Sequence, residues 1–523
     1  MDDIWDQIDN LLETRNESKH FEEKSLVKMN TNVNIHICIT REGTYIKNTE
    51  ELPHKVIKRI QKYFTISSKN IMGYFDHTSA WYYKKNILYI PRFGSFSLNK
   101  IFDNITWDNK ILSNNPVPNI KCNVEFNGNQ EIIFNKIMNT QFSSDSVKNG
   151  RAGLILNLQA GHGKTFLALY LIGVLKCRTL VVTHNSSILD QWVELIKKYL
   201  PDSNCGQYYG KKKILGDITV GVINSLVMDE IYKAPPEQFY NGFDFVILDE
   251  VHEYCSKTRR KIYKLANPTY MLGLSATPDE RIDLLDKINH WGCGDILVAN
   301  AIPGYTIKNI PFKGCVTSVY YSGPEIYTKQ IIIEKTELTS TPLMIGQLCE
   351  DPYRLNMIIS LILECHDKKL NTLVLADRRQ YLENIRLKLE ELKQDSFILT
   401  EKSELDQLAP IRLVGGSTSA EFEDAKLSKN IILSTFQFMG TGCSIPKLNA
   451  LVLATPRKTK GIQFVNRIFR LGSNYNIERQ IFDIIDTRTS LRSQWYERRK
   501  YYDEQRFEIK PRKISFEEFA NSL

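Results

Sequence analysis

The sequence predicts an α/β protein in which short apolar strands of a parallel sheet alternate with helices. Residues 151–158 (RAGLILNL) form an apolar run typical of a buried strand, and residues 165–175 (TFLALYLIGVL) are typical of the helix that follows it. Residues 243–254 (FDFVILDEVHEY) and 271–281 (MLGLSATPDER) are two further apolar strands that end in polar residues. Because ligands bind beyond the carboxyl ends of parallel strands, these polar ends are the first candidates for a site.

Composition sets broad limits on the class of protein. The 523 residues suffice for about three domains of roughly 150 residues each. A hydrophobic content of 42% and a charged content of 24% suit soluble globular domains, and no apolar run is long enough for a membrane span. The N-terminus lacks the apolar core of a signal peptide, so we expect a reducing compartment. The ten cysteines form no C-x-x-C pair, which argues against a zinc site and a disulfide framework.

Net charge gives a weaker indication of partners. The chain carries 68 Lys and Arg against 60 Asp and Glu, for a net charge of +8. This mild excess permits nucleic-acid binding without establishing it, because only clustered charge makes a track for phosphates.

The stretch NLQAGHGKT, residues 157–165, predicts a phosphate-binding loop between the first strand and its helix. Backbone N–H groups and the helix N-terminus would face the anion, Lys164 would reach the terminal phosphates, and the Thr165 hydroxyl would ligate Mg²⁺. The common pattern G-x-x-x-x-G-K-[ST] places glycine at the position of Leu158, so this loop departs from it.

The strand end Asp249-Glu250-Val251-His252 supplies the second signal, about 85 residues after the loop. An acidic residue at the end of a parallel strand can hold Mg²⁺, which indicates Asp249. The neighbouring Glu250 can then polarise the attacking water.

Together with Ser275-Ala276-Thr277, these motifs resemble superfamily 2 helicases. That family commonly has A-x-x-G-x-G-K-T in its first motif, which matches Gly161, His162 and Gly163, and many members carry Leu where this chain has Leu158. DEVH resembles its D-E-x-H box, including His252. The resemblance implies two RecA-like lobes in tandem with ATP and Mg²⁺ between them, and a serine–threonine motif that couples hydrolysis to nucleic acid.

Two later segments resemble the second lobe of such proteins. Residues 371–392 read as a strand and a helix that would open this lobe. Residues 430–456 resemble its fifth motif, with Gly442 in the turn. The family often has Asp where this chain has Ser444, so a role carried by that Asp is not implied.

Residues 463–472 (QFVNRIFRLG) resemble the sixth motif, Q-x-x-G-R-x-x-R. Gln463, Arg467 and Arg470 match, and Asn466 replaces the glycine. The spacing of the two arginines predicts that they lie near one face of a helix, and the resemblance implies an arginine finger toward the γ-phosphate.

Gln130 lies about thirty residues before the phosphate loop, where this branch of the superfamily often has a glutamine that reads adenine. An ordinary surface glutamine is the alternative.

Residues 178–200, with L-D-Q-W, and 216–227 resemble the DNA-repair and transcription branch and phage branch-migration helicases. Over residues 115–505 the chain is similar to poxvirus-type transcript-release DNA helicases of large cytoplasmic DNA viruses. This implies a DNA-dependent ATPase with 3′→5′ unwinding that acts in transcript release, with replication or recombination as further roles. It also implies that the protein acts in the viral factory of the host cytoplasm and is packaged in the virion.

The flanking regions carry no named motif. Aromatic and basic residues alternate in residues 71–102, notably Trp81, Tyr82 and Tyr83, which would suit DNA contact, although a core role is the alternative. We expect an N-terminal α+β accessory domain (1–112), a first lobe (113–300), an insertion or inter-lobe region (301–365), a second lobe (366–490) and a short C-terminal helical extension (491–523).

Three other functions fit the same motifs. An RNA helicase has the same D-E-x-H box, a duplex translocase differs only in lacking a strand-separating wedge, and an assembly factor would use ATP as a switch. We expect ATP and Mg²⁺ as cofactors, DNA as the partner with RNA or a transcription complex as alternatives, no membrane and a monomer.

Overall fold

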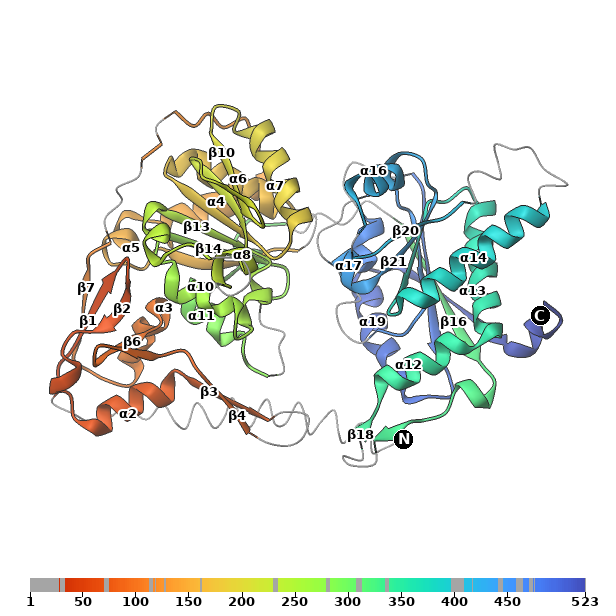
Figure 1. Ribbon diagram of the computed structural model, residues 1–523, viewed down its shortest axis with the longest axis horizontal. Coiled ribbons are helices and arrows are strands. Elements are labelled where there is room, and N and C mark those ends of the chain that lie inside the picture. Colours follow the sequence, from red (N-terminus) through yellow and green to blue (C-terminus); the bar gives the residue numbers. More distant parts are fainter. Residues whose placement is uncertain are drawn as a thin grey trace. The chain divides into compact units, whose positions relative to one another are not determined.

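The computed structural model comprises two compact units, residues 1–307 and 308–523 (Figure 1). The structure describes residues 28, 33–69, 75–111, 116–117, 119–126, 128–159, 162–228, 234–278, 283–306, 313–333, 338–396, 409–415, 417–440, 445–457, 464–469, 474 and 476–522. Within these ranges, no helix is both long and apolar enough to cross a bilayer.

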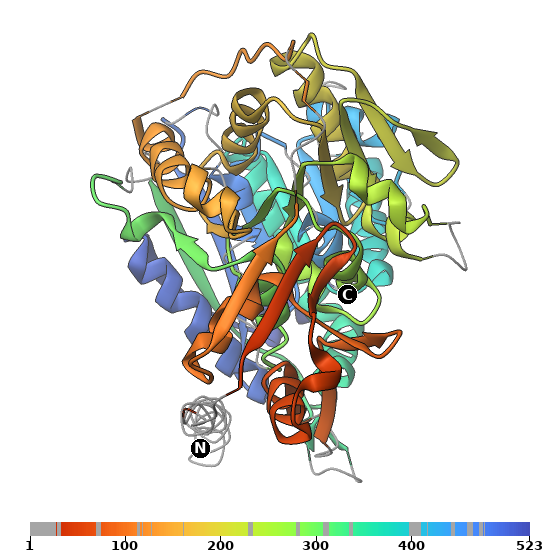
Figure 2. The ribbon, with the colours of Figure 1, turned by 90° about the vertical axis from the view of Figure 1, so that its left-hand side faces the viewer.

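The first unit begins with a small α+β domain, drawn in red and orange in Figures 1 and 2. Its elements are β1 (Ile35–Thr40), β2 (Gly43–Ile46), α2 (His54–Tyr63), β3 (Thr65–Lys69), β4 (Phe75–Ser79), β5 (Tyr82–Lys84), β6 (Ile87–Ile90), α3 (Arg92–Ser95) and β7 (Ile105–Asn109). Five strands form a sheet in the order β5-β6-β2-β1-β7, and β3 pairs with β4 in a separate ribbon. The sheet is covered by α2, because its residues Val56, Ile57 and Ile60 form one apolar face.

Two arginines fasten this domain to the rest of the first unit. Arg41 donates to the Phe243 carbonyl at 2.7 Å and forms a buried ion pair with Asp244. Arg92, almost fully buried, donates to the Gly150 carbonyl at 2.9 Å and to the carbonyls of Pro268 and Thr269.

The remainder of the first unit is built on an eight-stranded sheet. Its elements are α4 (Gly128–Asn139), α5 (Ser144–Lys148), β8 (Gly153–Asn157), α6 (Lys164–Leu175), β9 (Thr179–Thr183), α7 (Ser186–Tyr199), β10 (Cys205–Tyr209), β11 (Lys212–Ile214), β12 (Ile218–Val222), α8 (Ile223–Val227), β13 (Phe245–Asp249), α10 (Ile262–Leu265), β14 (Tyr270–Ser275), α11 (Lys287–Cys293) and β15 (Ile296–Val298). The strand order is β11-β10-β12-β9-β13-β14-β8-β15, and every pair except β10–β11 is parallel.

Both faces of this sheet are buried, which explains its continuous apolar strands. Along β13, Phe245 and Ile247 join the core under α6 and α7, whereas Val246 and Leu248 join the core under α10 and α11.

The second unit is built on a seven-stranded parallel sheet in the order β20-β21-β19-β22-β23-β16-β24. Its elements are β16 (Gly314–Ser322), β17 (Ile332–Ile333), β18 (Leu338–Thr339), α12 (Thr341–Glu350), α13 (Pro352–Asp367), β19 (Thr372–Ala376), α14 (Arg379–Ser396), β20 (Ile411–Leu413), α16 (Ser419–Leu427), β21 (Ile431–Thr435), α17 (Phe436–Gly440), β22 (Ala450–Leu453), β23 (Arg479–Asp486), α19 (Ser493–Glu504) and β24 (Glu508–Ser515).

The strand β16 changes the division expected for this part of the chain. It comes from the segment predicted as an insertion, residues 301–365, yet it lies within the sheet between β23 and β24. Likewise, the segment predicted as a helical extension, residues 491–523, contributes the edge strand β24 as well as α19. Both segments therefore contribute strands to the second unit's sheet.

Candidate active site

Three neighbouring strands of the first unit bring the predicted site residues to one edge of the sheet. β13, β14 and β8 are adjacent and parallel, with Asp249 opposite Leu274 and Ser275 opposite Asn157. The phosphate loop after β8, the DEVH segment after β13 and the serine at the end of β14 therefore emerge side by side.

The phosphate loop ends at Gly163, the N-cap residue of α6, with Lys164 and Thr165 in the first helical turn. Gly163 has φ of +89°, and a Cβ at this position would lie 2.1 Å from Gln130 Nε2. Only glycine fits there. This short distance also shows that Gln130 of α4 lies directly against the loop. Its side chain is buried, whereas the alternative interpretation of the sequence was an ordinary surface glutamine. Gly161 lies outside the described residues.

Leu158, which replaces the usual glycine, is a core residue. Its side chain is buried among the residues under α6 and α7, and its N–H donates to the Ser275 carbonyl at 3.2 Å. The leucine thus joins the start of the loop to the end of β14.

Asp249 is a buried carboxylate with two hydrogen-bond donors. Trp192 Nε1 of α7 donates to Oδ2 at 2.8 Å, and the Glu250 N–H donates to Oδ1 at 3.1 Å. Burial, followed by the negative charge of Glu250, raises the pKa of Asp249 to about 6, while the Trp192 bond and Lys164 act in the opposite direction. Positive charge near Asp249 would therefore favour its ionised form.

Glu250 lies between the phosphate loop and the end of β14. Its backbone has φ of +51°, an uncommon conformation for a residue with a side chain. Its Oε1 atom lies 4.0 Å from Lys164 Nζ, and its Oε2 lies 3.4 Å from His252 Nδ1. His252 Nδ1 is also hydrogen-bonded to Ser275 Oγ at 3.0 Å, which accepts from the Thr277 N–H at 3.0 Å. A continuous polar path thus connects Lys164 to the serine–threonine motif.

The donor set fits Mg²⁺ as P-loop proteins bind it. That ion usually takes one or two protein oxygens and keeps water and phosphate oxygens as its other ligands. The buried carboxylate of Asp249 beside a second acid, and the Thr165 hydroxyl at the start of α6, meet this need.

A further contact reaches the phosphate loop from the end of the first unit. Tyr305 Oη lies 3.3 Å from Nδ1 of His162. Burial and the charge of Lys164 lower the pKa of His162, which favours the neutral ring.

In the second unit, Arg467 can be placed but its predicted partner Arg470 cannot, because Arg470 lies outside the described residues. Arg467 lies in a 3₁₀ turn, Asn466–Ile468, which ends at Phe469. Arg479 Nε donates to the Ile468 carbonyl of this turn at 2.7 Å. Gln463, Arg470, Gly442 and Ser444 lie outside the described residues.

Asn466, which replaces the usual glycine, accepts a hydrogen bond at 2.6 Å from the Tyr501 hydroxyl of α19. Sequence reasoning missed the roles of Trp192, Arg479 and Tyr501. The L-D-Q-W motif drew attention to the segment that contains Trp192, but no local pattern links Tyr501 to Asn466.

A phosphate loop and an acidic strand end on a parallel sheet define a P-loop protein that hydrolyses nucleotides. Residues 123–280 match the family model described as type III restriction enzyme, res subunit. QP509L of African swine fever virus, named as an ATP-dependent RNA helicase, is 28% identical over 494 residues in the Badajoz 1971 Vero-adapted strain, covering 89% of this chain and 90% of that protein. In the isolate Pig/Kenya/KEN-50/1950 it is 30% identical over 375 residues, covering 68% and 69%.

Two further relatives have other names. Transcript termination protein A18 of fowlpox virus is 26% identical over 371 residues, covering 66% of this chain and 73% of that protein. The DNA 3′-5′ translocase XPB2 of Sulfurisphaera tokodaii is 34% identical over 151 residues, covering 28% and 33%. The chain belongs to the superfamily 2 helicases, in the family that includes QP509L, and is an ATP-hydrolysing enzyme.

Proposed function

We propose that the protein is a DNA-dependent ATPase that uses hydrolysis to move along DNA, in the 3′→5′ direction, and releases transcripts. The polar path from Lys164 through Glu250 and His252 to Ser275 carries the proposal, because it joins the phosphate end of the site to the serine–threonine motif. The names of the A18 and XPB2 relatives support transcription and DNA movement. Action in the cytoplasmic factory of a large DNA virus is part of the same proposal.

In this mechanism Lys164 holds the terminal phosphate oxygens of ATP, while Asp249 and Thr165 would hold Mg²⁺. The metal supplies charge neutralisation at the phosphates. Glu250 orients a water molecule and accepts its proton as the water oxygen attacks the γ-phosphorus. The bond from that phosphorus to the bridging oxygen breaks, and ADP and phosphate are the products. Gln130 is placed against the loop to contact the nucleotide.

RNA is the second candidate substrate, because QP509L is named as an RNA helicase. Measuring ATPase rates with single-stranded DNA, duplex DNA and RNA as separate activators decides between them. Stimulation by DNA and not by RNA is expected. Stimulation by RNA alone contradicts the DNA proposal, and an ATPase that no nucleic acid stimulates favours a nucleotide-switched assembly factor instead.

A further inference from the structure

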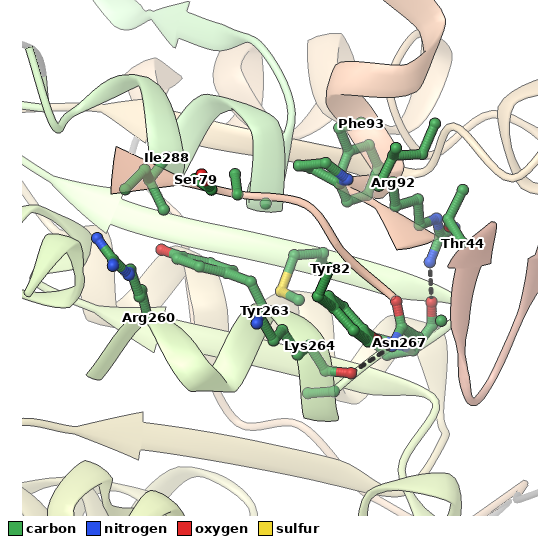
Figure 3. Close-up of a pocket in the computed structure, with 18 residues that line it drawn as sticks. Thr44, Ser79, Tyr82, Arg92, Phe93, Arg260, Tyr263, Lys264, Asn267 and Ile288 are labelled. Atoms are coloured by element: carbon green, nitrogen blue, oxygen red, sulfur yellow. Dashed lines mark hydrogen bonds between the residues drawn. The ribbon is translucent and has the colours of Figure 1, made fainter. Parts of the chain in front are cut away.

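A small pocket lies where the N-terminal domain meets the sheet-bearing part of the first unit (Figure 3). The domain supplies Thr44, Ser79 and Arg92 to its wall. Arg260 comes from the 3₁₀ turn that leads into α10, and Lys264 comes from α10 itself. Since α10 covers the face of the sheet opposite α6, this pocket is separate from the phosphate loop.

Cationic side chains line this pocket without carboxylate partners. Arg260 and Lys264 are four residues apart and so share one side of a helical turn. Across the described parts of the chain, neither forms an ion pair with a carboxylate, whereas the adjacent Arg259 pairs with Glu253 at 2.8 Å. Lys264 Nζ lies 4.3 Å from the ring centroid of Tyr82, on the opposite wall.

The electrostatic setting favours an anion between these groups. Burial lowers the pKa of Arg260, and burial together with the charges of Arg260 and Lys261 lowers the pKa of Lys264. Arg92 adds a buried positive charge whose hydrogen bonds go only to backbone carbonyls, and burial lowers its pKa to about 9, so it stays protonated at pH 7.

A hydroxyl group in the wall also lacks a partner. Thr44 is 2% exposed, and within the described structure its Oγ1 makes no hydrogen bond. Buried hydroxyls nearly always have a partner, so this atom indicates that a ligand or water completes the site.

The size of the pocket limits what it can hold. Its volume is about 50 Å³, and one water molecule needs about 10–15 Å³ on the same scale. A phosphate group fits with little room to spare, whereas a whole nucleoside does not. A phosphate also matches the chemistry, because guanidinium, ammonium and hydroxyl groups all donate hydrogen bonds to its oxygens.

We propose that this pocket binds a phosphate group, supplied either by the backbone of a nucleic-acid strand or by a free phosphate ion. Only the first source rests on the proposed function. Lys84 and Lys85, in and after β5, and Lys261 are exposed, and they lie close in sequence to the lining residues Tyr82 and Arg260, so they could offer further contacts to a continuous strand.

The test compares four variants of the full chain. Arg260→Ala with Lys264→Ala removes both unpaired cations, and both side chains are at least partly exposed, so the fold should survive. Ser79→Glu places a carboxylate in the wall, and Ser79→Gln is its uncharged match. Lys197→Ala removes one exposed charge from α7, on the opposite face of the sheet.

Two probes separate the two sources. Fluorescence anisotropy with a labelled single-stranded oligodeoxythymidine measures Kd across a range of salt concentrations. Each backbone phosphate contact that is lost should reduce the slope of log Kd against log salt by about 0.7. The shift of Tm on adding inorganic phosphate measures binding of the free ion.

A reduced slope in the double variant and in Ser79→Glu, with Ser79→Gln and Lys197→Ala unchanged, supports a backbone phosphate. Loss of only the inorganic-phosphate Tm shift supports the free ion. If neither property changes in the double variant and Ser79→Glu, the proposal is overturned. Failure of the wild-type protein to bind any nucleic acid would instead count against the proposed function. The Tm measurement would still test whether the pocket binds phosphate.

Discussion

At the scale of single residues, removing the positive charge of Lys164 is the first test of the site. Lys164→Ala removes the cation that faces the terminal phosphates, so ATP binding should weaken and hydrolysis should fall by about 10²-fold or more. ATPase assays and titration with a fluorescent ATP analogue measure the two effects. A wild-type rate in this variant would show that the phosphate loop is assigned wrongly.

Glu250→Gln should separate binding from turnover. The variant keeps the shape of the side chain and leaves Lys164 and Asp249 in place, but the amide cannot accept the proton of the attacking water. ATP affinity should stay close to the wild-type value while kcat falls sharply. If affinity falls as far as it does in Lys164→Ala, Glu250 is a binding residue rather than the base.

Trp192→Phe should change the requirement for Mg²⁺. The phenylalanine keeps an aromatic ring in the core but removes the hydrogen bond to Asp249. A hydrogen bond to a charged group is worth about 1.5–3 kcal/mol. We expect the Mg²⁺ concentration for half-maximal ATPase to shift. Trp107→Phe is the matched control, since the Trp107 Nε1 atom has no hydrogen-bond partner in the described structure. Equal responses of the two variants would argue against a specific role for the Trp192 bond.

At the scale of elements, α19 holds the turn that carries Arg467. Tyr501→Phe removes the hydrogen bond to Asn466 and should loosen this turn, lowering nucleic-acid-stimulated turnover while ATP affinity changes little. Tyr496→Phe, an exposed tyrosine of the same helix, is the control. Steady-state ATPase assays with and without nucleic acid measure the difference. A wild-type response in Tyr501→Phe would show that the turn does not depend on this contact.

The elements next to the phosphate loop were predictable because local pattern defines them. β8, α6, β13 and β14 have continuous apolar runs and polar ends, and their chemistry lies within a few residues of each strand. The place of β16 was not predictable from pattern alone, since it depends on pairing with β23 and β24 far along the chain. The contact between Arg479 and the Ile468 carbonyl was likewise not predictable from local pattern, because the two residues are eleven positions apart.

At the scale of the whole molecule, turnover should depend on residues of both units. Arg467→Ala combined with Arg470→Ala leaves the first unit intact, so ATP affinity should change little. By analogy with arginine fingers, stimulated turnover should fall by about 10³-fold or more. The matched control is Arg499→Ala, an exposed arginine of α19. Near-normal stimulated ATPase in the double variant would contradict the motor mechanism and favour a nucleotide switch within the first unit.

The position of β16 has a consequence for how the protein is made. This strand leaves the ribosome well before either of its neighbours, because Gly314 pairs with Arg479 and Cys315 with Glu508. During synthesis, the nascent second unit therefore carries an apolar strand with both backbone edges unpaired. Such edges pair readily with other chains. The sheet of this unit is consequently completed only after β24 has been synthesised.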